Sequence, residues 1–202
     1  MELTRSLTVF LVLLVLVGTA RLVELSISRR RQRALRASGV APVPEPHFRA
    51  MVSLHTAILI GAGLEAWLLR RQPLGLLSVV AVLVFLGANA LRIWVIATLG
   101  RHWNVQIMDS TALGVVATGP FRFIRHPNYV AVFAELAALP LIHGAWLTAL
   151  LGSAAHVWVL FHRVRTEEAA LLAHPQYRAL MGPKPRFFPR ARSLLPALRR
   201  SA

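Results

Sequence analysis

The chain has 202 residues, of which 56% are hydrophobic, and a formal net charge of +15. A mean hydropathy of +0.57 is too high for an ordinary soluble domain and indicates an integral membrane protein. The absence of cysteine excludes disulfides, thiolate nucleophiles and cysteine-bound metals. The arginines stand mainly at the ends of apolar runs, so their expected partners are lipid headgroups and not nucleic acid.

The first apolar run predicts a transmembrane helix over residues 7–27, because about twenty apolar residues cross the hydrocarbon. An arginine-rich stretch follows at residues 29–36 and is typical of the cytosolic flank of a span. The alternative is a secretory signal peptide cleaved near residues 18–20. Only Arg5 precedes the run, however, and the apolar pattern continues past that site.

The rest of the chain predicts four more spans and no strand. A proline-rich loop covers residues 37–50, where proline removes backbone donors. The four spans are expected at residues 51–69, 74–99, 129–142 and 145–161. A polar tail is expected at residues 183–202. The fourth run is short for a full crossing. We therefore expect an all-α polytopic membrane protein of about five transmembrane helices, forming a single domain over residues 1–202.

Five crossings place residues 28–50, residues 100–128 and the C-terminal region on one side of the membrane. That side carries most of the arginines, whereas the other carries only Arg5, Arg70 and Arg71. Because cytoplasmic loops hold the Lys/Arg excess, this side is predicted to be cytosolic.

Two polar clusters are expected to meet at the cytosolic ends of the last helices. His126-Pro127 opens the fourth helix, and a helix start offers unpaired amides that suit a carboxylate or phosphate. Arg163 and Glu167 are four residues apart and share a helical face. An acid and a base on one face could hold a zwitterionic or cationic ligand, or could form a solvated surface ion pair.

The motif Arg125-His126-Pro127-Asn128-Tyr129, preceded by Gly119 and followed by Arg163 and Glu167-Glu168, resembles the isoprenylcysteine carboxyl methyltransferase family. Phospholipid methyltransferases share much of this pattern. The similarity is strongest over residues 100–177. The first helix, with its basic flank, is similar to that of small bacterial members, which have about five membrane helices and no Rossmann domain. The resemblance therefore implies a bacterial inner-membrane protein whose active site faces the cytosol.

The resemblance implies S-adenosyl-L-methionine as cofactor, and no metal site is expected. By motif position, the expected cofactor-binding residues are Gln106, Leu113, Gly114, Val115, Val116, Phe121, His126, Pro127, Asn128, Tyr129 and Glu167. Arg163 and Glu167 are the expected catalytic residues, with Arg163 facing the methyl acceptor. Phe121 departs from the family pattern, which often has tyrosine there, and Tyr177 lies in a loop that also departs from it.

The expected partner is a lipophilic small molecule that enters the site from the bilayer and is methylated on a carboxylate or hydroxyl. Neither the acceptor, nor the choice between O- and N-methylation, nor the oligomeric state follows from the sequence. A membrane reductase of the sterol type, with a nicotinamide cofactor, and a non-catalytic multi-pass protein are the alternatives.

Several ionisable residues fall within predicted spans, where they are costly and usually face a partner or a cavity. They are Arg21, Glu24, His55, Glu65 and Arg92. A structural ion pair such as Arg21 with Glu24 and a place in a substrate cavity are both compatible with these positions. Trp103 is either an interfacial anchor or a ligand contact.

Overall fold

The computed structural model describes residues 2–189, and its described part contains helices and no strand. The long helices are α1 (Glu2–Ala37), α2 (Phe48–Leu68), α3 (Leu76–Leu99), α4 (Pro127–Leu141) and α5 (Trp146–Leu171). A short helix, α6 (Pro175–Met181), follows them. The prediction of an all-α polytopic membrane protein is confirmed.

Helices α1, α2, α3 and α5 are each long and apolar enough to cross a membrane. The fifth apolar helix, α4, has 15 residues and spans only about 22 Å at 1.5 Å per residue, less than the hydrocarbon thickness of about 30 Å. Large apolar side chains stand outward on the long helices: Val15 is 68% exposed and Leu76 is 78% exposed. Such a surface is stable in lipid and not in water, so the chain is an integral membrane protein.

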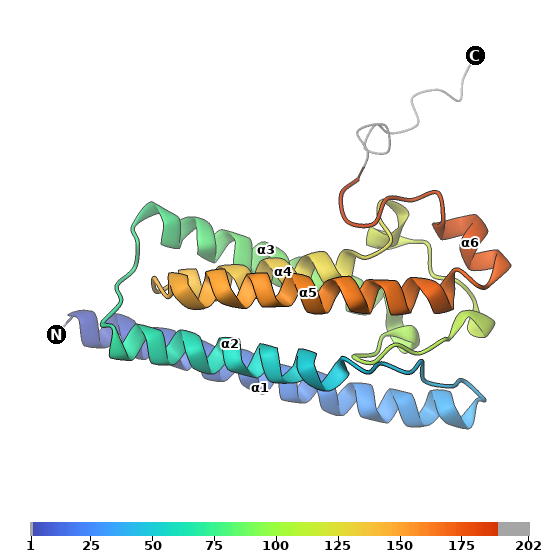
Figure 1. Ribbon diagram of the computed structural model, residues 1–202, viewed down its shortest axis with the longest axis horizontal. Coiled ribbons are helices and arrows are strands. Elements are labelled where there is room, and N and C mark those ends of the chain that lie inside the picture. Colours follow the sequence, from blue (N-terminus) through green and yellow to red (C-terminus); the bar gives the residue numbers. More distant parts are fainter. Residues whose placement is uncertain (1, 190–202) are drawn as a thin grey trace, which may run out of the picture.

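The five long helices run side by side along one axis (Figure 1). The N-terminus, the α2–α3 turn and the α4–α5 turn lie at one end. The α1–α2 loop, residues 100–126 and α6 lie at the other, which we call the site end. Gly144 fixes the α4–α5 turn: its φ is +73°, and a Cβ there would lie 2.3 Å from the Gln72 carbonyl oxygen of the neighbouring turn.

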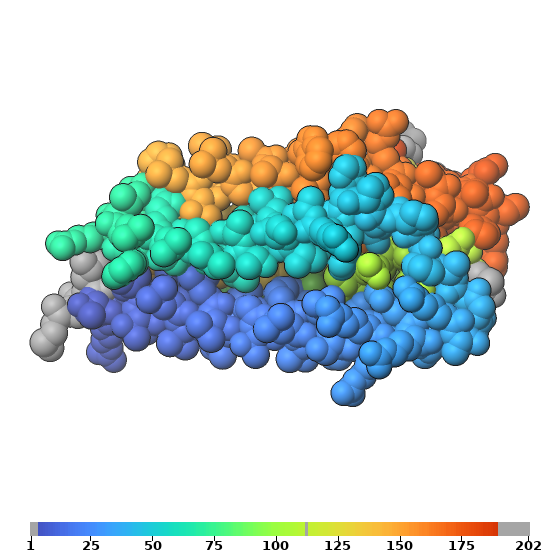
Figure 2. Space-filling view, turned by 60° about the horizontal axis from the view of Figure 1, so that its bottom comes forward, coloured from blue at the N-terminus to red at the C-terminus, as the bar shows by residue number. Residues whose placement is uncertain are grey.

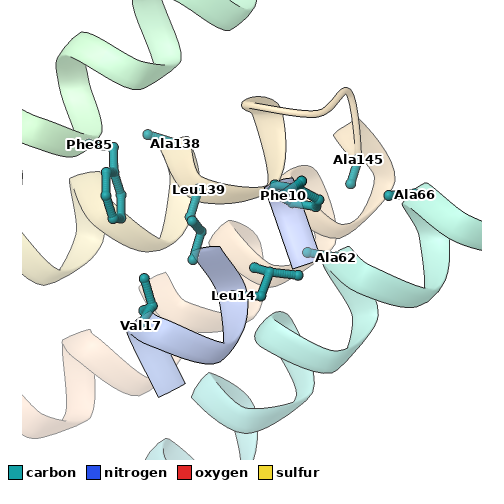
Figure 3. Packing of buried hydrophobic residues seen from close by; sticks show 9 residues of the cluster. All are labelled: Phe10, Leu14, Val17, Ala62, Ala66, Phe85, Ala138, Leu139 and Ala145. Atoms are coloured by element: carbon teal, nitrogen blue, oxygen red, sulfur yellow. The ribbon is translucent and has the colours of Figure 1, made fainter. Parts of the chain in front are cut away.

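The core near the N-terminal end joins side chains from each long helix or its flanking residue (Figure 3). Phe10 and Leu139 are almost fully buried there. The remaining members are mostly small or aliphatic: Leu14, Val17, Ala62, Ala66, Phe85, Ala138 and Ala145. Small residues let membrane helices approach closely, so this end is tightly packed.

Helices α1 and α5 extend beyond the predicted spans. α1 continues through the basic stretch to Ala37, and α5 continues ten residues past residue 161. Arginine, glutamate, alanine and leucine all have high helix propensity, so the loss of apolar character does not end either helix. Arg163 and Glu167 consequently lie inside α5.

The polar tail predicted over residues 183–202 needs a correction for its first part. Residues 183–189 pack against the site end, where Lys184 donates a 2.7 Å hydrogen bond to the Phe121 carbonyl oxygen. The tail's remaining residues, 190–202, lie outside the described part of the chain.

Glu65, one of the ionisable residues in a predicted span, is a structural residue. Its carboxylate accepts hydrogen bonds from the backbone of Leu147 at 3.2 Å and of Thr148 at 2.7 Å. These amides open α5, and a carboxylate at a helix start is favoured by the helix dipole. Arg71 completes the arrangement with a 3.1 Å ion pair.

Candidate active site

A polar pocket lies at the site end between residues 100–126, the start of α4, the C-terminal half of α5 and α6. It encloses about 890 Å³ of empty space, mouth included, which is in the range of small-molecule sites. The structure brings most of the sequence-predicted residues into its wall. These are Gln106, Gly114, Val115, Val116, Phe121, His126, Asn128, Tyr129, Arg163 and Glu167.

Two predicted residues do not line the pocket. Leu113 turns away and packs against a small cluster formed by Leu35, Val40 and Met108. Pro127 is the buried first residue of α4, where its fixed φ suits the helix start. Both support the pocket wall from behind and have no surface in it.

Tyr129 joins the two residues that were predicted to be catalytic. Its hydroxyl donates a 2.5 Å hydrogen bond to a carboxylate oxygen of Glu167. The Nε of Arg163 donates a 3.0 Å hydrogen bond to the same hydroxyl oxygen. Arg163 and Glu167 are thus linked through a phenol and not by a direct ion pair.

The ion-pair partner of Arg163 is Glu45, which sequence reasoning missed. The Nη1 of Arg163 lies 3.2 Å from a carboxylate oxygen of Glu45, and the two side chains are 10% and 7% exposed. Glu45 also accepts a hydrogen bond from the Ile107 amide. Burial raises the pKa of Glu45, and the opposing effects of Arg163 and the Ile107 amide offset this only in part. Because Glu45 lies in a proline-rich loop 118 residues before Arg163, no periodic pattern connects the two positions.

His126 is held by the second glutamate of the pair. Its Nε2 lies 3.0 Å from Glu168 Oε1, and its Nδ1 lies 3.7 Å from Glu167. Glu168 is buried and also pairs with Arg125 at 3.1 Å and Arg186 at 2.6 Å. It therefore positions His126 and lies outside the pocket wall.

The amides of Arg125 and His126, which directly precede α4, are hydrogen-bonded within the protein. The Arg125 amide donates to the Pro185 carbonyl at 2.9 Å, and the His126 amide donates to the Arg186 carbonyl at 3.0 Å. The segment after α6, predicted as part of a polar tail, therefore occupies two of the backbone donors beside this helix start.

Other donors and acceptors in the pocket wall have no protein partner. Within residues 2–189, six buried side-chain polar atoms lack a hydrogen-bond partner, and four of them belong to residues that line this pocket. They are the Trp103 Nε1, Asn104 Oδ1, Arg125 Nε and Asn128 Oδ1. Since buried polar groups are normally paired, this concentration indicates a ligand that carries both acceptors and donors.

Burial, reinforced by Glu167, raises the pKa of Tyr177 in the wall of the pocket, so this phenol stays protonated.

A second, larger cavity lies beside the pocket, between α1, α2, α4 and α5. It holds about 1390 Å³ of empty space, mouth included, and the surface of its wall is mostly apolar, although charged and histidine side chains also line it. Part of the segment that follows α3 is visible between α1 and α2 from outside (Figure 2). The cavity and the pocket share five lining residues: Trp103, Asn104, Asn128, Tyr129 and Arg163. We call this shared wall the junction. Trp103 is 3% exposed and lies there, not at the lipid surface.

The fold and the site define a polytopic membrane protein in which a polar pocket and an apolar cavity meet at one wall. The chain belongs to the isoprenylcysteine carboxyl methyltransferase family, whose model matches residues 79–177, from α3 into α6. The resemblance inferred from the sequence motifs is confirmed, and the protein is a membrane methyltransferase.

Two relatives extend the similarity over most of the chain. A Bacillus subtilis protein described as "Uncharacterized protein YpbQ" is 27% identical over 166 residues, covering 80% of this chain and 96% of the relative. A Haemophilus influenzae protein described as "Uncharacterized protein" is 31% identical over 156 residues, covering 75% and 88%. Both matches are longer than the region that the family model matches.

Proposed function

We propose that this protein transfers a methyl group from S-adenosyl-L-methionine to a carboxylate or hydroxyl of a lipophilic acceptor, at the cytosolic face of a bacterial inner membrane. The observation that carries this proposal is the junction, where residues of one wall face both a polar pocket and an apolar cavity. A transferase with one charged and one lipid-soluble reactant needs this arrangement.

The polar pocket suits the charged ends of the cofactor. The free Trp103 and Arg125 donors would hold its carboxylate, and Glu167 with the Asn104 and Asn128 oxygens would hold its ammonium group. When bound, the cofactor supplies an electrophilic methyl group on a sulfonium.

The junction residues would align the acceptor oxygen. Arg163 keeps its guanidinium fixed through Tyr129, Glu45 and the Val105 carbonyl, so it offers a preorganised positive edge to the cavity. Alignment and exclusion of water account for most of what a protein must add to a transfer of this kind.

The acceptor's protonation state decides which further residues act. A carboxylate acceptor needs no base. A hydroxyl acceptor must lose its proton, and Tyr129 lies between the cavity and the Glu167 carboxylate. The acceptor proton would pass to the Tyr129 oxygen as the tyrosine proton passes to Glu167.

The arginine distribution supports a cytosolic site. At the N-terminal end, the described cationic side chains are Arg5, Arg70 and Arg71, whereas most of the remaining arginines lie at the site end. Cytoplasmic ends of membrane helices carry this excess.

The test is calorimetric titration of the detergent-purified protein with S-adenosylhomocysteine, for the parent, Glu167→Gln and Arg165→Gln. Arg165 is exposed on the same helix and does not line the pocket, so it is the matched control. We expect binding to the parent and the control, and binding at least about tenfold weaker in Glu167→Gln, since a charged hydrogen bond contributes about 1.5–3 kcal/mol.

Labelled methyl transfer into lipid extracts would then identify the acceptor. A folded parent that binds no S-adenosylhomocysteine contradicts the cofactor assignment. Binding of a nicotinamide dinucleotide phosphate in the same titration would favour the reductase alternative.

A further inference from the structure

Four of the long helices each have a residue that lies at or directly beside the junction. Arg163 of α5 donates to Tyr129 of α4 and to the Val105 carbonyl, and its Nη1 lies 2.7 Å from the Met51 sulfur of α2. Ser28 of α1 accepts a 2.9 Å hydrogen bond from the Val105 amide. These contacts place one residue of each helix around a single point.

A layer of charged and imidazole side chains lines the apolar cavity farther from the site end. Counted from the junction residue of each helix, its members lie four to seven residues toward the N-terminal end, which is roughly 6–10 Å at 1.5 Å per residue. The layer consists of Arg21, Glu24, His55, Glu135 and His156, together with Arg92, which is seven residues from Leu99 in the pocket wall. Such residues are rare inside membrane helices and usually mark a functional pathway or site.

The charged half of the layer is neutral as a group. Arg21 pairs with Glu135 at 2.5 Å and with Glu24 at 2.6 Å, and Arg92 pairs with Glu24. Two guanidinium groups thus face two carboxylates, and no charge remains for an ionised group of a ligand at this depth.

The uncharged half has unused hydrogen-bonding capacity. His55 Nε2 lies 3.3 Å from His156 Nδ1, while the Nε2 of His156 has no partner, although the residue is only 3% exposed. When His55 and His156 share one hydrogen bond as neutral rings, the Nε2 of His156 is a donor in one tautomer and an acceptor in the other. A buried polar atom without a partner costs free energy that a ligand oxygen would recover.

We infer that the His55–His156 pair is a recognition site for a hydroxyl or carbonyl oxygen within the hydrocarbon part of the acceptor, roughly 10 Å from the methylated atom. The identification of this ligand as the acceptor rests on the proposed function. The preferred substrates are therefore lipophilic molecules with a second oxygen in the middle of the chain, and simple hydrocarbon chains bind less tightly because they leave His156 unpaired.

The experiment compares two probes: octadecanoic acid and a hydroxyoctadecanoic acid whose hydroxyl lies midway along the chain. Each displaces a fluorescent fatty acid from the detergent-purified protein, in the presence and absence of S-adenosylhomocysteine. The proteins are the parent, His156→Phe, His156→Gln and the control His162→Phe. His162 lies on the same helix, contacts the Trp158 ring at a tilt and does not line the cavity.

We expect the parent and His162→Phe to bind the hydroxy acid at least about tenfold more tightly than the unsubstituted acid, which corresponds to about 1.4 kcal/mol. In His156→Phe the preference disappears, while the affinity for the unsubstituted acid is kept. His156→Gln retains part of the preference, because its amide can still hydrogen-bond, and provides a second reading if the phenylalanine variant does not fold.

Three results would overturn the inference: equal affinities in the parent, no binding of the hydroxy acid by the folded parent, or a preference that survives in a folded His156→Phe. Binding of S-adenosylhomocysteine is measured separately. If it is absent while the histidine-dependent preference is present, the cofactor assignment fails and the oxygen site stands.

Discussion

The Tyr129 hydroxyl lies 2.5 Å from a Glu167 carboxylate oxygen and 3.0 Å from the Arg163 Nε, so one phenol connects the polar pocket with the guanidinium at the junction. The two residues it joins are on the same helix, one turn apart. Within the described residues, the side chains of Arg163 and Glu167 form no direct hydrogen bond with each other and are joined only through this phenol.

Removing that hydroxyl should impair catalysis more than folding. In Tyr129→Phe, Glu167 and Arg163 each lose one charge-assisted hydrogen bond, worth about 1.5–3 kcal/mol. We expect kcat/KM for methyl transfer to fall by about 10- to 100-fold, with a smaller change in the unfolding midpoint, measured by radiolabel transfer and thermal denaturation. An unchanged kcat/KM would mean that the phenol is only a packing residue.

The two adjacent glutamates should give opposite results. Glu168→Gln leaves the buried Arg125 and His126 without their carboxylate, so we expect about 3 kcal/mol lower stability, the usual result of breaking a buried pair. Glu167→Gln, whose side chain is 25% exposed, should lose cofactor affinity with little loss of stability. Thermal denaturation and S-adenosylhomocysteine titration of both variants separate the two effects, and equal destabilisation would contradict the assignment.

Glu45 and Arg163 should be energetically coupled. Arg163→Gln leaves a buried carboxylate, and Glu45→Gln leaves a buried guanidinium, so each single variant should be markedly destabilised. The double variant should be less stable than the parent by clearly less than the sum of the two. A double-mutant cycle on unfolding free energies measures this coupling, and simple additivity would show that the pair does not interact.

The Asp109–His174 contact, which ties residues 100–126 to the start of α6, predicts a pH dependence. Burial alone would raise the pKa of Asp109, but hydrogen bonds from Thr111 and His174 lower it below its usual value. A lowered pKa in the folded state stabilises the fold above the unfolded value near 4 and loses this contribution as pH falls through the folded value.

The unfolding difference between the parent and Asp109→Asn should therefore be constant near neutral pH, at up to about 1 kcal/mol, and shrink below about pH 4. Melting curves from about pH 7 to about pH 2.5 give this difference. A difference that does not change over this range would show that the carboxylate charge is irrelevant to the contact.

The helices and much of the pocket wall could be predicted because each depends on local pattern. Apolar runs gave the spans, and the motif from Arg125 to Tyr129 lies at a helix start that proline makes recognisable. The spacing of Arg163 and Glu167 correctly placed them on one helix.

The missing parts depend on contacts between distant segments. Glu45 meets Arg163 across 118 residues, His55 meets His156 across 101 residues, and Arg186 joins Glu168 from a segment that has no periodicity. Only the folded arrangement of the helices makes these residues partners. The sequence showed that His55 and Arg21 are ionisable residues inside predicted spans, where they are energetically unfavourable, but it did not identify their partners.

The length of α1 has a consequence for how the reaction would be measured. Its 36 residues extend about 54 Å, well beyond a hydrocarbon layer of about 30 Å, so the helix enters the aqueous phase and forms part of the site end there. Under the proposed function, the cofactor arrives from water and the acceptor from lipid. The rate would then follow the number of acceptor molecules per area of membrane: adding empty lipid to a proteoliposome would slow the enzyme, whereas adding buffer at a fixed cofactor concentration would not.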